Sequence, residues 1–261
     1  MDVRVLQISD THLFSLKDGR IKGVNSFQSL ERVLAKAFDT HKQIDFVVLT
    51  GDLSQDETVE SYTNLAELIA PYHPRIFYIP GNHDDKGLMK QVFAPYPSLL
   101  PGSSLNLGDW TFVFLDTALE GRAEGVLSEL ELSRLVDVQD HSRANHLAIF
   151  LHHNPVTMDP RRVDPMMLTN AERLLEVLDE RVKAVVCGHV HQGLVQSLGG
   201  IDYIASPSTC VQFCPTATGL TIDNKAPGYR YLEFHSTGQV ETSVYRLDEV
   251  PEGLYQIDGD L

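Results

Sequence analysis

Short runs of consecutive apolar residues alternate along this chain with segments in which apolar residues recur every three or four positions. The runs predict buried strands, at residues 3–8, 45–50, 75–79, 146–151 and 182–187. The first three strands are separated by two segments with helical spacing, at residues 26–38 and about 57–72, and Ser26 is the expected N-cap of the first helix. Two consecutive strand–helix–strand units of this kind indicate an α/β fold.

The rest of the chain adds a hairpin and two helix starts. Residues 103–107 and 110–115 flank a two-residue turn that contains glycine, which predicts a hairpin. Residues 128–131 and 169–172 each read as a capping box, so we expect a helix to begin at both places.

Residues 85–101 predict a short helical segment followed by a proline-rich surface connection. Residues 193–261 alternate short strands with turns, and we expect them to form the hairpins that complete a second sheet. A chain of 261 residues with 43% hydrophobic content can bury a substantial core, and no linker divides it. We therefore expect residues 1–261 to form a single domain.

Polar residues follow most of the predicted strands directly. They are Asp10 and His12, Asp52, Asn82 and His83, His152, and His189 and His191. Side chains two apart on an extended chain point to the same side, so Asp10 with His12, and His189 with His191, are expected to converge. A turn aspartate or a satisfied buried histidine is the alternative for any one of them alone. Together they predict a site at the strand ends, where α/β sheets open a crevice.

The number of nitrogen and oxygen donors in this set exceeds what one tetrahedral ion needs. Two cations are the interpretation that uses them all. One shared aspartate can bridge two ions about 3.5–4 Å apart, and a water between them has a pKa lowered toward about 7, which supplies hydroxide at neutral pH.

The charge of the chain narrows the class of partner. Lysine and arginine number 21 against 36 acidic residues, a formal net charge of −15. A basic face for nucleic acid or an anionic membrane is therefore not expected, and a small molecule is the expected partner. Three cysteines are too few for a disulfide framework, and residues 1–4 lead into a strand without an apolar signal segment. Both features favour the cytoplasm.

The polar series, in this order and at these separations, resembles the calcineurin-like metallophosphoesterases. The stretches that carry the resemblance are Asp10-x-His12, Gly51-Asp52, residues 81–84, His152 and Gly188-His189-x-His191. Four further stretches, residues 10–14, 168–171, 207–213 and 226–230, resemble the bacterial class III 3′,5′-cyclic AMP phosphodiesterases. The family fold implied is a four-layer α/β/β/α sandwich with two mixed β-sheets flanked by helices.

The resemblance implies a role for each ligand position. Asp10, His12 and His191 would hold one metal ion, and Asn82, His152 and His189 would hold the other. Asp52 would bridge the two ions. The family's metals are iron, manganese or zinc, and the donors do not choose among them, because imidazoles suit iron or zinc and oxygens suit manganese. A tandem histidine leaves open which ring coordinates, and the resemblance favours His152 over His153.

The implied reaction is hydrolysis of cyclic AMP to 5′-AMP by attack of a metal-bridging hydroxide. His83 is absent from the metal set, and we expect it to give a proton to the leaving 3′-oxygen, with Asp84 holding it as imidazolium. Asp84 as the N-cap of the next helix is the alternative. Asn82, His83 and His153 are the residues expected to contact substrate.

Two other functions fit the same core. One is a broader phosphodiesterase or phosphomonoesterase, for example on glycerophosphodiesters. The other is a non-catalytic scaffold, which is disfavoured because every ligand position carries a residue that can bind metal.

Cys210 and Cys214 lack a second pair to complete a zinc site, so packing or a free thiol is expected. Arg161, Arg162 and Arg230 are expected to be ordinary solvated arginines.

Overall fold

Two six-stranded sheets lie face to face in the computed structural model, which describes residues 1–158, 166–215 and 220–254. The first sheet has the order β16-β15-β1-β4-β5-β6, formed by β1 (Val3–Ile8), β4 (Phe46–Thr50), β5 (Ile76–Ile79), β6 (Leu99–Pro101), β15 (Gly228–Phe234) and β16 (Val240–Arg246). The second has the order β11-β12-β10-β9-β8-β7, formed by β7 (Ser104–Leu107), β8 (Trp110–Phe114), β9 (His146–Phe150), β10 (Val182–Cys187), β11 (Leu194–Leu198) and β12 (Ile201–Ala205).

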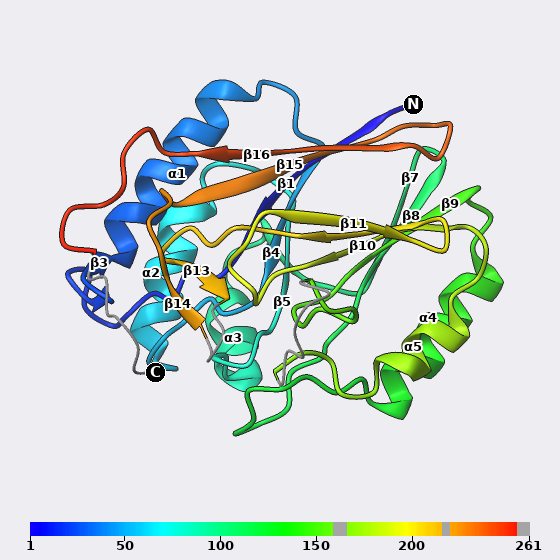
Figure 1. The fold of residues 1–261 in the computed structure, drawn as a ribbon, viewed down its shortest axis with the longest axis horizontal. Coiled ribbons are helices and arrows are strands. Elements are labelled where there is room, and N and C mark those ends of the chain that lie inside the picture. The colour runs from blue at the N-terminus through cyan, green and yellow to red at the C-terminus, as the bar shows by residue number, and fades with distance from the viewer. Residues whose placement is uncertain (159–165, 216–219, 255–261) are drawn as a thin grey trace.

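Helices cover the outer faces of both sheets, so the predicted four-layer α/β/β/α sandwich is confirmed (Figure 1). The helices are α1 (Ser26–Thr40), α2 (Val59–Ile69), α3 (Lys86–Phe93), α4 (Glu129–His141) and α5 (Ala171–Val177). The first three gather on one side of the molecule and the last two on the other. No helix in the described part of the chain combines the length and apolar character needed to cross a bilayer.

Alternation along β1 explains how the layers are held together. Val3 and Val5 pack between the two sheets, whereas Leu6 and Ile8 face the helices. Gln7 is also buried, and its side-chain amide donates to Thr50 Oγ1 at 2.9 Å and to the carbonyl oxygen of Cys187 at 3.0 Å. This amide links the two sheets close to their carboxyl ends.

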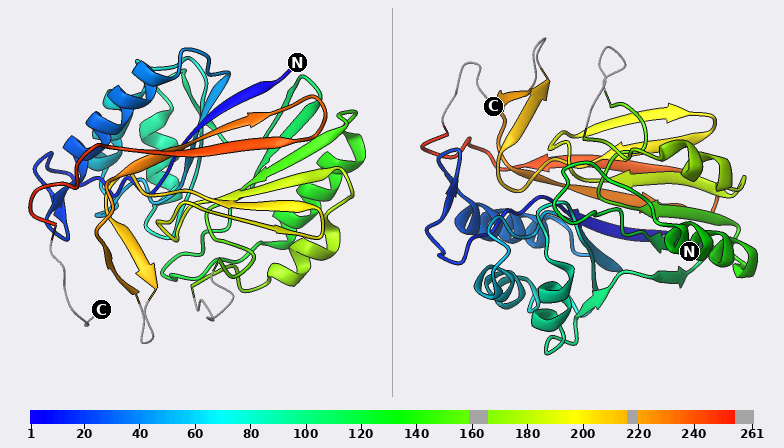
Figure 2. Two further views of the ribbon diagram at one scale, coloured as in Figure 1. Left: turned by 45° about the horizontal axis from the view of Figure 1, so that its top comes forward. Right: turned by 90° about the horizontal axis from the view of Figure 1, so that it is seen from below.

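The C-terminal region differs from the prediction. We expected residues 193–261 to complete one sheet, but β11 and β12 join the second sheet while β15 and β16 join the first, where β15 pairs antiparallel with β1. The short hairpin of β13 (Gln212–Pro215) and β14 (Leu220–Asp223) stands apart from both (Figure 2). A second small pair, β2 (Arg20–Ile21) and β3 (Val24–Asn25), precedes α1. Strand pairing over such separations leaves no local pattern in the sequence.

The residues that cap two of the helices differ from the prediction. Asn25, not Ser26, caps α1 by accepting a hydrogen bond from the backbone N–H of Gln28. Ser128 caps α4 as predicted. The second capping box is wrong, because α5 begins after Asn170 without a side-chain cap.

Two segments, residues 169–170 and residues 99–101, account for the remaining differences from the prediction. The side chain of Asn170 hydrogen-bonds both backbone groups of Leu127, and Thr169 Oγ1 donates to the carbonyl of Gly125. These groups therefore tie two loops together instead of starting the helix. The proline-rich connection is also more ordered than expected, because Leu99–Pro101 pairs with β5 as the edge strand β6.

Candidate metal centre

The loops that follow β1 and β10 bring three buried side chains to one point. Nε2 of His12 lies 3.2 Å from Nε2 of His191, which lies 3.3 Å from Oδ1 of Asp10. Ligand atoms that sit about 2.1 Å from one ion are roughly 3 Å apart. The predicted first ligand set therefore has a spacing that fits a metal ion.

Asp52, after β4, lies between this group and a second one. Its Oδ2 is 3.8 Å from Nε2 of His12, and its Oδ1 is 3.4 Å from Nε2 of His152. Oδ1 of Asn82, after β5, is 3.2 Å from the same His152 nitrogen. The two oxygens of one buried carboxylate thus face two different histidines, which is the arrangement that a bridging ligand requires.

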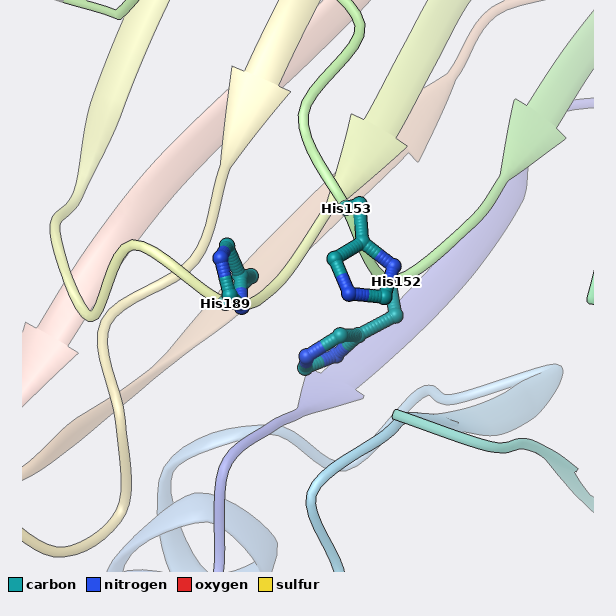
Figure 3. Close-up of side chains that lie close together, drawn as sticks. All are labelled: His152, His153 and His189. Carbon is teal, nitrogen blue, oxygen red and sulfur yellow. The ribbon is translucent and has the colours of Figure 1, made fainter. Parts of the chain in front are cut away.

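His152, His153 and His189 form the other side of the site (Figure 3). The ring centroid of His189 lies 5.1 Å from that of His152 and 4.8 Å from that of His153. His153 is fully buried, its Nδ1 lies 2.8 Å from Thr117 Oγ1, and its Nε2 has no hydrogen-bond partner. The structure therefore places both members of the tandem histidine at the site.

Backbone carbonyls fix which nitrogen of two rings faces the cluster. Nδ1 of His152 lies 2.7 Å from the carbonyl oxygen of Thr50, and Nδ1 of His191 lies 2.7 Å from that of Val211. A carbonyl only accepts, so each Nδ1 carries a hydrogen and each Nε2 is the nitrogen that faces the cluster. These carbonyls are functional groups that the sequence did not reveal, since a main-chain group has no residue signature.

The backbone at the site is locally unusual. Seven non-glycine residues of the described chain have positive φ, and five of them are predicted ligands: Asp10 (54°), His12 (46°), Asp52 (51°), His189 (68°) and His191 (51°). Such values are uncommon for side chains with a Cβ and cluster at functional sites. Left-handed turns, and not strand alternation, therefore bring Asp10 and His12 together after β1. The expected convergence of His189 with His191 is not seen, because the turn after β10 directs His191 to Asp10 and His12, and His189 to His152 and His153.

Glycine permits the closest approach of two of these loops. A Cβ added to Gly81 would lie 2.2 Å from Oδ1 of Asp52. Any larger residue before Asn82 would therefore displace the carboxylate between the two groups.

Electrostatics in the cluster depend on burial and on close pairs of opposite charge. Burial lowers the pKa of His12 to about 4, so its ring is neutral at pH 7. Burial opposes ionisation of Asp52, but His152 and His12 together hold its pKa well below the usual value. Burial likewise opposes charge on His152, yet the Asp52 carboxylate raises its pKa to about 9. Buried carboxylates of this kind require a cation for compensation, and the donor set fits metal ions in that place.

His83 lies beside the cluster. Its backbone N–H donates to Oδ1 of Asp52 at 2.9 Å, and its half-buried ring meets that of His12 edge to face at 5.2 Å. The predicted contact with Asp84 is not formed, since the described residues show no hydrogen bond or ion pair between them. The two side chains serve different parts of the site.

Asp84 instead joins two ligand-bearing loops. Its carboxylate accepts from the backbone N–H groups of Gly81 (2.9 Å), Leu53 (3.0 Å) and Ser54 (3.1 Å) and from the Tyr62 hydroxyl (3.2 Å). Burial and the charge of Asp52 raise its pKa to about 7 against these hydrogen bonds. The capping alternative is also wrong, because Asp85 caps α3.

The cysteines and Arg230, for which the sequence predicts no part in the site, lie outside the cluster. Cys210 is buried and Cys214 is exposed, and neither forms a disulfide among the described residues. Arg230 is not solvated as expected, because it is 2% exposed and its guanidinium donates to the carbonyls of Ala205 and Leu194 and to Thr242 Oγ1. Arg161 and Arg162 lie outside the described residues.

Comparison with known proteins agrees with this geometry. The chain is 34% identical over 260 residues to the 3′,5′-cyclic adenosine monophosphate phosphodiesterase CpdA of Pseudomonas aeruginosa, covering 99% of this chain and 94% of that one. It is 37% identical over 248 residues to CpdA of Escherichia coli strain K12, covering 94% and 90%. A dimetal phosphatase of Danio rerio shares the fold with a TM-score of 0.63 at 16% identity, over 94% of this chain and 98% of that one. The model of the calcineurin-like phosphoesterases matches residues 3–193, and the chain therefore belongs to this family.

Proposed function

We propose that this protein is a metal-dependent hydrolase that converts 3′,5′-cyclic AMP to 5′-AMP. Two kinds of observation support the substrate, the nearly full-length similarity to cyclic AMP phosphodiesterases and the polar cluster at the strand ends. The observation that carries the chemistry is Asp52, whose two oxygens face His12 and His152 separately. A strongly negative chain can still bind an anionic diester there, because two divalent ions bring more positive charge than two carboxylates remove.

The ligand assignment extends to two ions. Asp10, His12 and His191 would hold one ion, and Asp52 would serve both. The second would be held by Asn82, His152 and His189. Iron, manganese and zinc all suit this mixture of imidazole and oxygen donors. When bound, such ions neutralise charge on the phosphodiester and lower the pKa of water, which supplies the nucleophile.

His83 is the proposed source of the proton for the leaving 3′-oxygen. Its backbone is held by Asp52 and its ring stands at the rim of the cluster, half-buried and beside His12. Asp84 supports this position indirectly by tying the loop that precedes His83 to residues 53 and 54. A proton donor at this point matters because an alkoxide is a poor leaving group.

Two further contacts to substrate are proposed. Asn82 adjoins His83, and its side chain lies against His152. The unpartnered Nε2 of buried His153 can hydrogen-bond a phosphoryl oxygen.

We also propose that residues 1–261 form one domain, since β15 and β16, from the end of the chain, belong to the same sheet as β1. Three cysteines without a disulfide among the described residues suit the cytoplasm, the proposed location.

A substrate panel tests this function. Metal-loaded protein would be assayed with cyclic AMP, cyclic GMP, a 2′,3′-cyclic nucleotide, glycerophosphocholine and an aryl phosphodiester. We expect the highest kcat/KM among the natural esters with cyclic AMP. A higher value with glycerophosphocholine would overturn the assignment in favour of a glycerophosphodiesterase.

A further inference from the structure

A cavity of about 350 Å³ lies next to the metal centre, on the far side of His191. Its walls include His191, Gln192, Leu194, Lys225, Val244 and Arg246. They come from the start of β11, the end of β16 and the base of the β13–β14 hairpin. The edge strands of the two large sheets approach each other here, since a Cβ added to Gly193 would lie 2.6 Å from Cγ2 of Val244. Because His191 belongs to both the cluster and the cavity, the cavity begins one imidazole away from the ligand atoms.

The wall beside His191 is already fixed in place. The ring of Phe213 stacks on the His191 ring with centroids 4.7 Å apart, and the side chain of Gln212 is almost fully buried and donates to the Ser208 carbonyl at 2.8 Å. The Val211 carbonyl orients the same histidine. One short segment, residues 211–213, thus positions a proposed metal ligand and shapes the cavity, so binding there requires little ordering of the wall.

Arg246 gives the cavity its charge. Nη1 of this half-buried guanidinium donates to Oε1 of Gln212 at 3.0 Å and to the Ala226 carbonyl at 2.7 Å, and both acceptors are neutral. No carboxylate lies within ion-pair distance of it in the described residues. Lys225, at the exposed side, already pairs with Asp223 at 2.6 Å. The cavity therefore offers N–H donors to an uncharged or anionic acceptor.

The remaining walls suit a flat ring. Leu194 and Val244 are apolar and half-buried, and the Gln192 amide supplies both a donor and an acceptor. A purine has apolar faces and acceptor nitrogens along its edges, a glutamine amide can pair with the N6 and N7 atoms of adenine, and a guanidinium stacks on or donates to such rings. A volume of about 350 Å³ lies within the range for small-molecule pockets.

We propose that this cavity receives the adenine base of the substrate while the phosphodiester lies at the ligand cluster, an inference that rests on the proposed function. Val244 and Leu194 contact the faces of the ring, and Gln192 and Arg246 hydrogen-bond its edge. Glycerophosphocholine has no planar ring with hydrogen-bonding edges to match these walls. The cavity is thus the part of the protein that separates cyclic nucleotides from other phosphodiesters.

Two variants and a matched control test the cavity. Val244→Phe fills it, Arg246→Gln removes its cationic donors, and Val195→Phe makes the same change at a half-exposed β11 position outside it. We expect kcat/KM for cyclic AMP to fall about tenfold more than kcat/KM for an aryl phosphodiester in the first two variants, the scale of one lost pocket contact. Val195→Phe should keep the wild-type ratio. Bound metal is measured in each protein.

A binding measurement on wild-type protein loaded with Zn²⁺ separates the cavity from catalysis, because adenosine has no phosphodiester to hydrolyse. Adenosine should shift the backbone and side-chain amide NMR signals of Gln192 and its cavity neighbours, and ribose should not. Equal losses on both substrates, or an adenosine titration without shifts at the cavity, would overturn the proposal. If wild-type protein hydrolyses the aryl diester but not cyclic AMP, the proposed function fails, and the adenosine titration alone then decides whether the cavity binds a base.

Discussion

Two clusters of histidine and acidic side chains lie at opposite ends of β1. At its carboxyl end are Asp10 and the other proposed ligands. The second cluster lies at the start of β1, where Val3 pairs with Phe234. Its ligand atoms, from Glu233, His235 and Glu241, also lie within 4.8 Å of one another. Residue type and proximity alone would rank the two clusters together.

The two clusters differ in burial, in ion pairs with neighbouring residues and in backbone conformation. Asp10 is 0% and Asp52 3% exposed, whereas the side chain of Glu241 is 59% exposed. In the second cluster Glu233 already pairs with Arg4 at 3.0 Å and His235 with Asp2 at 3.2 Å. Deep burial of two carboxylates among histidines, without lysine or arginine partners among the described residues, together with a left-handed backbone, marks a functional site, whereas the exposed cluster is an ordinary network of surface ion pairs.

The largest contrast is expected in catalysis. His83→Ala should reduce kcat for cyclic AMP by about 10²–10⁴-fold while metal content stays at the wild-type level, because His83 handles a proton and is not a ligand. The loss should be smaller for an aryl phosphodiester, whose phenolate leaves without protonation. His235→Ala is the matched control and should leave kcat unchanged. Equal losses on both esters would assign His83 to substrate positioning instead.

Metal removal should change stability through the buried cluster only. An ion that binds the native state at a free concentration 1,000 times its Kd stabilises that state by about 4 kcal/mol. Chelation should therefore lower the melting temperature of the wild-type protein and of Glu241→Ala to the same extent. A smaller chelator effect in Glu241→Ala would mean that the exposed cluster also holds an ion.

Asp84 offers a smaller test of how the site is built. Asp84→Ala leaves three backbone N–H groups and the Tyr62 hydroxyl without their acceptor, which should cost about 1–3 kcal/mol of unfolding free energy in urea. The neighbouring Asp85→Ala removes a helix cap and should cost about 1 kcal/mol. If Asp84→Ala unfolds with the same free energy as the wild-type protein, Asp84 does not tie the loops as described.

The smallest effect is expected at the exposed cluster. Glu241→Gln should change the free energy of unfolding by less than about 0.5 kcal/mol, because an exposed ion pair contributes little. A cost above about 1 kcal/mol in the same urea titration would show that this cluster stabilises the fold more than an exposed ion pair usually does.

The sequence predicted the positions of the ligands more reliably than their geometry. Consecutive apolar residues require cover on both faces, so the strands and the polar residues that end them were readable locally. The conformation of Asp10 was not, because it depends on its backbone N–H reaching the Gly51 carbonyl on a neighbouring loop. The function of Asp84 likewise depends on residues 53 and 54, which no spacing rule connects to it.

Long-range pairing set the other limits of prediction. In the first sheet β1 pairs with β15, which follows it by more than two hundred residues, and neither segment identifies its partner. Arg230 shows the same limit at the level of one side chain, since its burial depends on carbonyls of β11 and β12. Asn25 and Ser26 are both capable N-caps, and only the structure distinguishes them.

Metal content per chain distinguishes a centre of two ions bridged by Asp52 from a centre of one ion. Wild-type protein loaded with excess Mn²⁺ should retain two ions, as should a Glu233→Ala/Glu241→Ala double variant, and Asp52→Ala should lose metal from both positions because its carboxylate serves both. Elemental analysis of the three purified proteins gives these numbers. One ion or none in the wild-type protein, or two ions retained by Asp52→Ala, would rule out a pair of ions bridged by Asp52.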